Sequence, residues 1–303
     1  MKTVGMNETQ RTRPVVFGEV LFDHFPDGKA VLGGAPFNIA WHLQAFAKAP
    51  VLVSRVGNDP LGRQIRQAME DRTMSTAGLQ LDSQHPTGTV DVTFSDGEPS
   101  YDIVKDRAWD FINDQLLPPM DDMALLYHGS LALRSPVSRH AFEAIQQSDD
   151  VPVFIDVNLR EPWWSRDDVL SLLRRARWAK MNADELALLL PDLDEPEQRA
   201  KALLQDYALE WVLVTLGDKG AQAFTAGGET LSVAPDRSTD VVDTVGAGDA
   251  FASVLILGLL NDWPMQLTLQ RAQGFASSIV GVRGATVSDK VFYQQFCKDW
   301  NLA

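Results

Sequence analysis

Short apolar runs alternate with longer amphipathic segments along most of the chain, and this alternation constrains the fold more than any other feature. Strand-like runs rich in Val, Leu, Ile and Phe lie at 14–18, 51–55, 124–128, 153–157, 178–182, 211–215 and 231–242. Repeated strand–helix units with apolar strands are typical of a mainly parallel sheet covered by helices on both faces. The sequence therefore predicts an α/β fold.

Two stretches depart from this alternation. Residues 20–32 alternate apolar and polar side chains around a turn at 27–28, and residues 87–110 contain two short strand-like runs joined by a turn. Both patterns are typical of strand pairs with one solvated face. We expect these segments to form a small sheet that acts as a lid on a single domain spanning residues 14–303.

The composition excludes several classes of protein. The chain has 303 residues and a formal net charge of −14, whereas nucleic acids and anionic membranes attract clustered Lys and Arg. Its single cysteine, Cys297, cannot form an intrachain disulfide, and no apolar run is long enough to span a bilayer. Residues 1–13 lack the apolar stretch of a signal peptide and are expected to be a loose tail. We therefore expect a cytoplasmic protein without nucleic-acid or membrane partners.

Polar and flexible residues follow the ends of several predicted strands. They are Asp156, Asn158 and Arg160, then Asn182 and Glu185, then Thr215 and Gly217, and finally Gly246 to Asp249. In open parallel sheets, ligands bind beyond the carboxyl ends of the strands. We therefore expect these groups to form one site.

The segment Asp243-Thr-Val-Gly-Ala-Gly-Asp249 has the composition of an anion-binding turn. Its small residues allow a sharp turn and close approach of a ligand, and the apolar run 250–260 predicts a helix just beyond. The unpaired N–H groups at a helix start attract negative charge. Asp249 has two readings: a first-turn capping residue, or a base kept ionised by the helix end that accepts a proton from a bound group.

Other polar residues also have two readings. Asn38 falls in the first turn of a helix predicted after Gly33-Gly34, where it could read a ligand hydroxyl or be an ordinary surface residue. Asn182 and Glu185 are three apart at a helix start and could hold Mg²⁺ through water or cap the helix. Asp23, near a turn, could be a ligand or a solvated charge.

Phosphoryl transfer would use these groups well. It needs N–H groups or cations around the phosphoryl group, a metal, and a base for the attacking hydroxyl. Arg160 can neutralise phosphate charge, and Asp249 can be the base. The chain lacks a Walker A motif, a complete dinucleotide fingerprint and the histidine spacing of a zinc site.

Taken together, these motifs resemble the PfkB, or ribokinase-like, carbohydrate kinases. The segment 243–249 is similar to the C-terminal signature of that family, and Gly33-Gly34-x-x-x-Asn38 is similar to its N-terminal signature. Asn182-x-x-Glu185 and Thr215-Leu-Gly217-x-x-Gly220 lie between them in the family's order. The likeness covers about residues 14–290 and implies the ribokinase-like fold and transfer of the γ-phosphoryl group of ATP to a sugar hydroxyl.

The resemblance also implies roles for matching residues. The catalytic group would comprise Asp249 as base, Gly246, Ala247 and Gly248 as anion hole, and Arg160. The sugar would be bound by Asp23, Gly33, Gly34 and Asn38, and the nucleotide by Asn182, Thr215, Gly217 and Gly220. Glu185 would serve Mg²⁺ through water, and Asp243 with the Val245 carbonyl matches a K⁺ site, with the loop 284–288 opposite.

Three motifs narrow the choice of sugar substrate. Gly18-Glu-x-Leu-x-Asp23, Gly33-Gly-Ala-Pro36 and Asp156-x-Asn-x-Arg160 are most similar to bacterial fructokinases, which favours D-fructose phosphorylated at O6. The alternatives are a ribokinase and a 2-keto-3-deoxygluconate kinase, whose substrate carboxylate could pair with Arg107. A catalytically silent sugar-binding regulator is the alternative from another class. The exposed edges of the lid favour a homodimer through it.

Overall fold

One long sheet forms the centre of the molecule. In the computed structural model, which describes residues 11–95, 98–147, 151–235 and 241–302, nine strands follow the order β13-β12-β11-β10-β9-β8-β1-β4-β5. Every neighbouring pair from β11 to β5 is parallel, and β12 and β13 continue antiparallel. The strands are β1 Arg13–Phe17, β4 Val51–Gly57, β5 Leu79–Asp82, β8 Met123–His128, β9 Val153–Asp156, β10 Trp178–Asn182, β11 Trp211–Thr215, β12 Ala221–Thr225 and β13 Thr230–Val233. The predicted mainly parallel α/β fold is confirmed.

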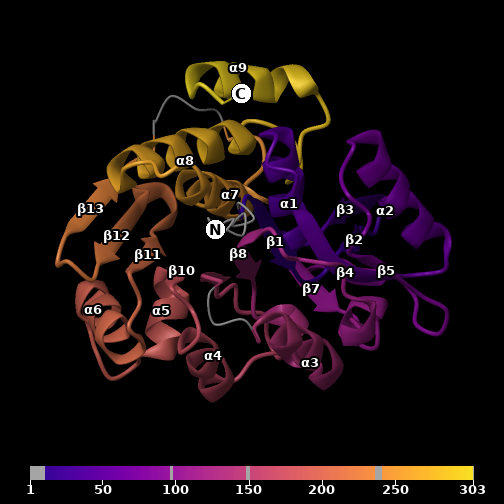
Figure 1. The fold of residues 1–303 in the computed structure, drawn as a ribbon, viewed down its shortest axis with the longest axis horizontal. Helices are drawn as coiled ribbons and strands as arrows, with labels where there is room; N and C mark the ends of the chain where they lie inside the picture. The colour runs from indigo at the N-terminus through magenta and orange to yellow at the C-terminus, as the bar shows by residue number, and fades with distance from the viewer. Residues whose placement is uncertain (1–10, 96–97, 148–150, 236–240, 303) are drawn as a thin grey trace, which may run out of the picture.

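Helices cover both faces of this sheet (Figure 1). One face carries α1 Ala35–Ala45, α2 Pro60–Asp71, α7 Ala247–Leu260, α8 Met265–Val280 and α9 Lys290–Asp299. The other carries α3 Pro136–Ile145, α4 Arg166–Leu173, α5 Ala183–Leu189 and α6 Pro196–Tyr207. Because both faces are buried, the central strands are apolar on both sides, which is the pattern the sequence displayed.

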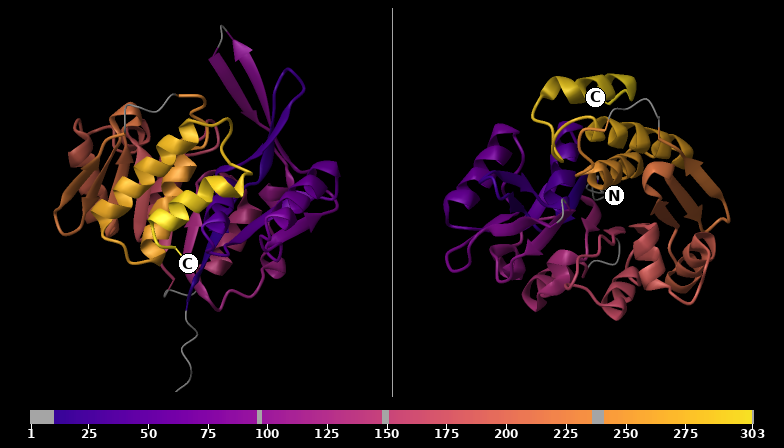
Figure 2. Two further views of the ribbon diagram at one scale, coloured as in Figure 1. Left: turned by 90° about the horizontal axis from the view of Figure 1, so that it is seen from above. Right: turned by 180° about the vertical axis from the view of Figure 1, so that it is seen from behind.

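A second, four-stranded sheet stands apart from the first. Its order is β3-β2-β6-β7, with β2 and β6 parallel and the outer pairs antiparallel. The strands are β2 Leu21–His24, β3 Ala30–Gly33, β6 Gly88–Ser95 and β7 Glu98–Ile103. Figure 2 shows the β6–β7 hairpin rising away from the body of the molecule. The segments 20–32 and 87–110 thus do form one small sheet.

Several element boundaries differ from those expected. Strand β13 ends at Val233, so it is shorter than the strand predicted at 231–242, of which residues 236–240 lie outside the described part of the chain. The N–H groups of Val242 and Asp243 donate to the Val280 carbonyl. The helix expected from residue 250 begins at Ala247, so Asp249 lies inside its first turn. Strand β1 begins at Arg13, inside the expected tail, of which residues 1–10 lie outside the described part of the chain.

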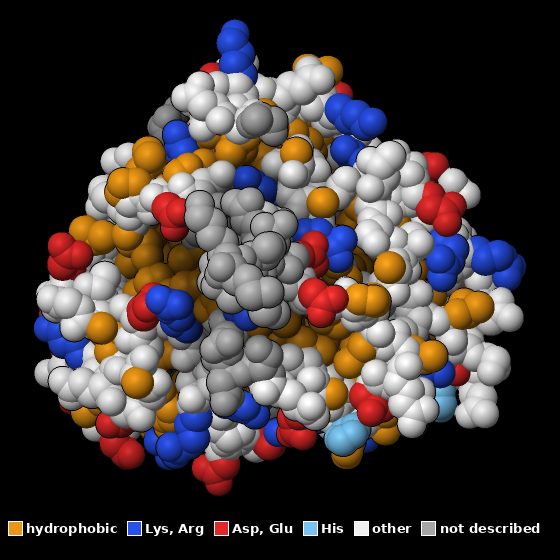
Figure 3. Space-filling view, viewed as in Figure 1, with side chains coloured by type: hydrophobic (Ala, Val, Ile, Leu, Met, Phe, Trp, Pro, Cys, Tyr) orange, Lys and Arg blue, Asp and Glu red, His pale blue; other side chains and the backbone are white. Residues whose placement is uncertain are grey.

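Charges of both signs are scattered over the face drawn in Figure 3, without a large patch of one sign. Within the part of the chain that the structure describes, no helix combines the length and apolarity needed to cross a membrane.

Candidate active site

A cavity of about 520 Å³ lies between the carboxyl ends of the parallel strands, the start of α7 and the small sheet. Most of the residues that sequence reasoning selected line it: Asp23, Gly34, Asn38, Arg160, Asn182, Glu185, Thr215, Val245, Gly246, Gly248 and Asp249. The small sheet adds Leu21, Val90, Tyr101 and Ile103 to its wall. Gly33, Ala247, Gly217, Gly220 and Asp243 are not among the lining residues. The structure therefore joins segments from both ends of the chain in one site.

Asp249 makes its closest polar contact across the molecule. Its Oδ2 accepts a hydrogen bond of 2.7 Å from Nδ2 of Asn38, which lies on α1. The other amide atom of Asn38, Oδ1, is buried and has no partner among the described residues. Asn38 therefore orients the carboxylate with one end of its amide and leaves the other end available for a ligand hydroxyl.

Asp249 is not a helix cap. The residue preceding α7 is Gly246, and no side chain caps this helix end. Gly246 has a φ of 81°, and a Cβ there would lie 2.4 Å from Cα of Ala285, so both the conformation and the close approach require glycine. Burial raises the pKa of Asp249, although the Asn38 hydrogen bond opposes the shift, so the expectation that the helix end keeps this carboxylate firmly ionised is corrected.

The start of α7 presents free N–H groups to the cavity. The N–H of Ala247 turns back to the Thr244 carbonyl, and that of Ala250 bonds to the Gly246 carbonyl. Among the described backbone hydrogen bonds, the N–H groups of Gly248 and Asp249 have no acceptor. Two donors at the positive end of a helix form a site for an anion.

A buried lysine that sequence reasoning missed lies beside this helix end. Lys180 on β10 is 6% exposed, and its Nζ forms a 2.6 Å ion pair with Oδ2 of Asp156 on β9. The same Nζ would lie 3.7 Å from a Cβ placed on Gly248. A positive charge is therefore fixed next to the free N–H groups. The signal in the sequence was a single lysine within an otherwise apolar strand.

A second missed residue is Glu19, in the link between β1 and β2. It lines the cavity, is 3% exposed, and its Oε2 has no partner among the described residues. Burial raises its pKa to about 7, against the opposing charge of Arg160. Tyr127 lies near, and burial together with the carboxylates of Asp156 and Asp249 raises its pKa well above the usual value.

Asp23 and Arg160 form the outer part of the cavity. Asp23 is half-buried on β2, and burial raises its pKa to about 6. Arg160 is exposed, yet its charge favours the ionised forms of Asp23, Glu19 and Asp249. An exposed cation facing several carboxyl groups can also meet an incoming phosphate.

Asn182 and Glu185 form a capping box at the start of α5. Oδ1 of Asn182 accepts from the Glu185 N–H at 2.8 Å, and Oε2 of Glu185 accepts from the Asn182 N–H at 2.8 Å. Oε1 of Glu185 accepts from the Leu159 N–H at 2.8 Å. The capping interpretation of this pair is correct. Each carboxylate oxygen retains a lone pair toward the cavity, which suits contact with a metal-bound water better than direct ligation.

The two glycines expected to bind a nucleotide, Gly217 and Gly220, differ from Thr215 in their surroundings. Thr215 ends β11 and lines the cavity, whereas Gly217 and Gly220 lie in the turn that follows. A Cβ on Gly220 would lie 1.9 Å from the Val233 carbonyl oxygen, so packing against β13 accounts for this glycine.

Asp243 ties the anion-binding turn to the loop 284–288. Its Oδ1 accepts from the Val245 N–H and its Oδ2 from the Gly284 N–H, both at 3.0 Å. Trp41 Nε1 and Arg72 donate to the Val287 carbonyl on the far side of the loop. The loop is thus fixed against the helix end.

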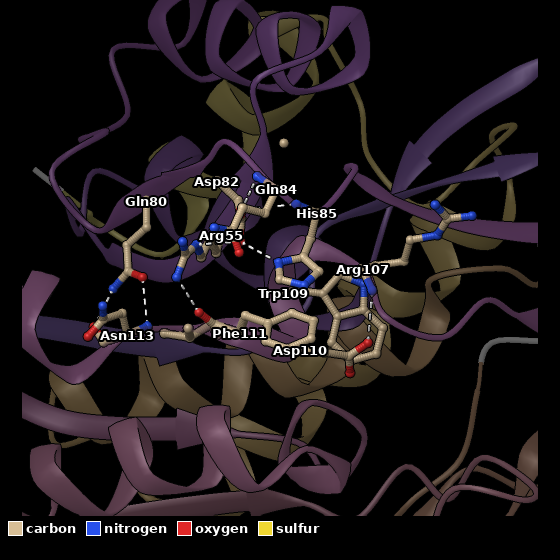
Figure 4. A network of polar contacts seen from close by, with 12 residues as sticks. Arg55, Gln80, Asp82, Gln84, His85, Arg107, Trp109, Asp110, Phe111 and Asn113 are labelled. Atoms are coloured by element: carbon tan, nitrogen blue, oxygen red, sulfur yellow. Dashed lines mark hydrogen bonds and ion pairs between the residues drawn. The ribbon is translucent and has the colours of Figure 1, made fainter.

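A polar network joins the segment that leads into β6 to the segment that follows β7 (Figure 4). Asp82, at the end of β5, accepts from the N–H groups of Gln84 and His85 and pairs with Nε of Arg55 at 3.0 Å. Arg55 also donates to the Phe111 carbonyl, and the His85 ring stacks on Phe111 at 3.6 Å. The segment before β6 is therefore bonded to Asp82 on β5, and the segment after β7 to Arg55 on β4, and these two side chains pair with each other.

Known proteins are similar to this chain in sequence and in fold. The family model described as "pfkB family carbohydrate kinase" matches residues 10–291. A fructokinase from Klebsiella pneumoniae is 33% identical over 80% of this chain and 83% of its own length. An aminoimidazole riboside kinase from Salmonella typhimurium is 31% identical over 84% of this chain and 83% of its own. The crystal structure of a Vibrio cholerae fructokinase double mutant in a fructose-, ADP- and potassium-bound form has a TM-score of 0.79 and 28% identity, covering 94% of this chain and 98% of that one.

Proposed function

Because this chain belongs to the PfkB family of carbohydrate kinases, we propose that it transfers the γ-phosphoryl group of ATP to O6 of D-fructose. The observation that carries this proposal is the contact between Asn38 and Asp249, which places the expected base beside a vacant amide acceptor in one cavity. Fructose is favoured as substrate because fructokinases are prominent among the relatives.

Asp249 is the base in this proposal. In its ionised form it accepts the proton of the attacking sugar hydroxyl, while Asn38 holds it in place and binds the sugar with Oδ1. Because burial raises its pKa, Asp249 is a better proton acceptor than an ordinary aspartate once it is ionised. Asp23 and the backbone at Gly33 and Gly34 complete the sugar subsite.

Groups on three sides stabilise the negative charge of the phosphoryl group that is transferred. The N–H groups of Gly248 and Asp249 lie at the helix start, Lys180 lies next to Gly248, and Arg160 closes the outer side. Fixed donors and cations of this kind stabilise charge that develops in the transition state. The nucleotide would extend over Asn182, Thr215, Gly217 and Gly220.

Metal ions would enter with the substrates. Mg²⁺ bound to the ATP phosphates would keep several waters, and Glu185 fits contact with such a water because both its oxygens already accept N–H bonds. The ion would neutralise charge on the phosphates. K⁺ would be held by Asp243 and the Val245 carbonyl, opposite the loop 284–288, and Asp243 already bonds to both segments.

The small sheet would act as a lid and as a dimer surface. It contributes five residues to the cavity wall, so its movement would exclude water from the reacting groups. Its outer strands β3 and β7 carry exposed Val31 and Tyr101, and pairing of two copies would cover these edges. Light scattering across a dilution series tests this, with twice the chain mass expected.

A second candidate substrate is aminoimidazole riboside, favoured by the 31% identity with the Salmonella kinase. The 2-keto-3-deoxygluconate alternative gains no support, because Arg107 is not among the residues that line the cavity.

An ADP-release assay decides between these substrates. The enzyme with Mg-ATP is given fructose, ribose, aminoimidazole riboside and 2-keto-3-deoxygluconate in turn. The proposal predicts the highest kcat/KM with fructose. A higher kcat/KM with another acceptor would identify that acceptor as the substrate in place of fructose. No turnover with any of the four would favour a catalytically silent sugar-binding protein.

A further inference from the structure

Glu19 is buried in the wall of the sugar cavity and has no role in the mechanism above. It is 3% exposed and belongs to the short link between β1 and β2, the first connection from the large sheet to the lid. A Cβ on Gly34 would lie 2.7 Å from the Glu19 carbonyl oxygen, so the Gly-Gly turn packs directly on its backbone. Its position is thus fixed by the elements that build the sugar subsite.

One oxygen of the Glu19 carboxyl, Oε2, is buried without a hydrogen-bond partner among the described residues. An unpaired buried polar atom is costly, and an unpaired buried charge is more so. Such an atom in a ligand cavity is explained when the ligand itself supplies the missing partner.

Burial favours the neutral form of Glu19, and the charges around it act in both directions. It faces Asp249 from α7, Tyr127 from β8, Arg160 from the loop after β9 and Arg134 from the segment after β8. Asp23 lines the same cavity from β2, and the Asp156–Lys180 pair beside it is already neutral as a unit. Burial is the largest influence, and it raises the pKa of Glu19 to about 7. A neutral carboxylic acid in a cavity can donate a hydrogen bond.

We propose that Glu19 is a specificity-determining residue of the sugar subsite, which in its protonated form donates a hydrogen bond to one oxygen of the acceptor sugar. This inference rests on the proposed sugar-kinase function. It makes Glu19 distinct from Asp249: Asp249 must be ionised to accept a proton, whereas Glu19 must keep its proton to bind. The two carboxyl groups therefore have opposite requirements in one cavity.

A specific pH dependence follows. In the wild-type enzyme, kcat/KM for the sugar falls on the acid side as Asp249 is protonated and on the alkaline side, near pH 7, as Glu19 loses its proton. Glu19→Gln keeps a neutral donor of nearly the same shape. We expect this variant to retain the sugar KM to within about threefold and to lose the alkaline limb, because glutamine does not titrate.

Removing the donor has a different effect. Glu19→Met keeps the length of the side chain but cannot bond, and we expect the sugar KM to rise about tenfold or more while the KM for ATP stays unchanged. A panel of monodeoxy-fructoses identifies the sugar oxygen involved. Removal of that hydroxyl raises the KM of the wild-type enzyme but not that of Glu19→Met, because both changes remove the same contact. Glu70→Gln, at an exposed site on α2, is the matched control and keeps the wild-type profile.

The outcomes separate this inference from the proposed function. The role of Glu19 alone is overturned if the wild-type enzyme turns over sugar and either of two results is found. One is an unchanged sugar KM in Glu19→Met, and the other is an alkaline limb that persists in Glu19→Gln. Wild type that phosphorylates no sugar overturns the proposed function, and the role of Glu19 falls with it. If Glu19→Met fails to fold by circular dichroism, the pH profile of Glu19→Gln still decides.

Discussion

Two carboxyl groups of the cavity, Asp249 and Glu19, depart from ordinary surface behaviour because both are enclosed. Burial raises the pKa of each, and their partners differ: Asp249 accepts from Asn38, whereas one oxygen of Glu19 has no partner among the described residues. At the scale of single residues, each makes a separate prediction.

Asp249→Asn tests the base. The variant keeps the shape of the side chain but cannot take the proton of the sugar hydroxyl, so we expect kcat to fall by about 10²–10⁴-fold. Nucleotide affinity, measured by calorimetry, should remain near the wild-type value. Asp194→Asn, at an exposed position, is the control. Near-full turnover in Asp249→Asn would show that another group accepts the proton.

Glu19→Gln also predicts a change in stability. The pKa of Glu19 is raised from 4.5 to about 7, so between these values the folded protein binds more protons than the unfolded chain. The contribution of Glu19 is therefore complete below the lower value and is lost as the pH rises through about 7. We expect the Tm of Glu19→Gln, relative to wild type, to increase from about pH 5 to pH 8 in thermal scans. A constant difference would mean that Glu19 does not titrate in this range.

At the scale of elements, the connection between the two sheets depends on Asp82. It is 1% exposed and joins Arg55 to the backbone of the segment that leads into β6. Asp82→Ala leaves the Arg55 charge without its carboxylate, and we expect a loss of about 3–5 kcal/mol in the free energy of unfolding. Denaturant titration measures it, and the exposed Asp192→Ala should change little. Equal stability of the two variants would show that Asp82 does not stabilise the connection between the two sheets.

The elements also show what the sequence can predict. Strand positions followed from apolar runs because a sheet buried on both faces needs them. The sequence did not predict the short edge strand β5 or the end of β13 at Val233. Both segments have mixed polarity, and only contacts with neighbouring strands decide their pairing. The start of α7 at Ala247 was also missed, since a glycine-rich turn gives no periodicity to mark it.

The candidate site was predictable where a motif marks it. Asn38, Asp249, Gly34, Gly246 and Gly248 belong to such motifs and line one cavity. Lys180 and Glu19 were not predicted as site residues, because the local sequence shows neither the pairing of Lys180 with Asp156 nor the burial of Glu19. Side-chain pairing across the sheet is a tertiary property, and local patterns do not contain it.

At the scale of the whole molecule, aromatic side chains of α1, α8 and α9 bind the C-terminal helix to the core. Phe275 is fully buried, and its ring lies within 5.1 Å of those of Phe46 and Phe296. Phe275→Ala would leave a cavity between these helices, and we expect a loss of about 3–5 kcal/mol in unfolding free energy. Val291→Ala, at a position 65% exposed, should be nearly neutral. A small effect in Phe275→Ala would mean that α9 packs on the core by other contacts.

The central claim is that this fold transfers phosphate to O6 of fructose. It is tested most directly by incubating the enzyme with Mg-ATP and fructose labelled with ¹³C at C6, and recording the carbon spectrum. The account predicts that the C6 signal shifts and becomes split by phosphorus as ADP forms. An unsplit C6 signal in fructose, with ATP unconsumed or its phosphate released to water, would contradict it.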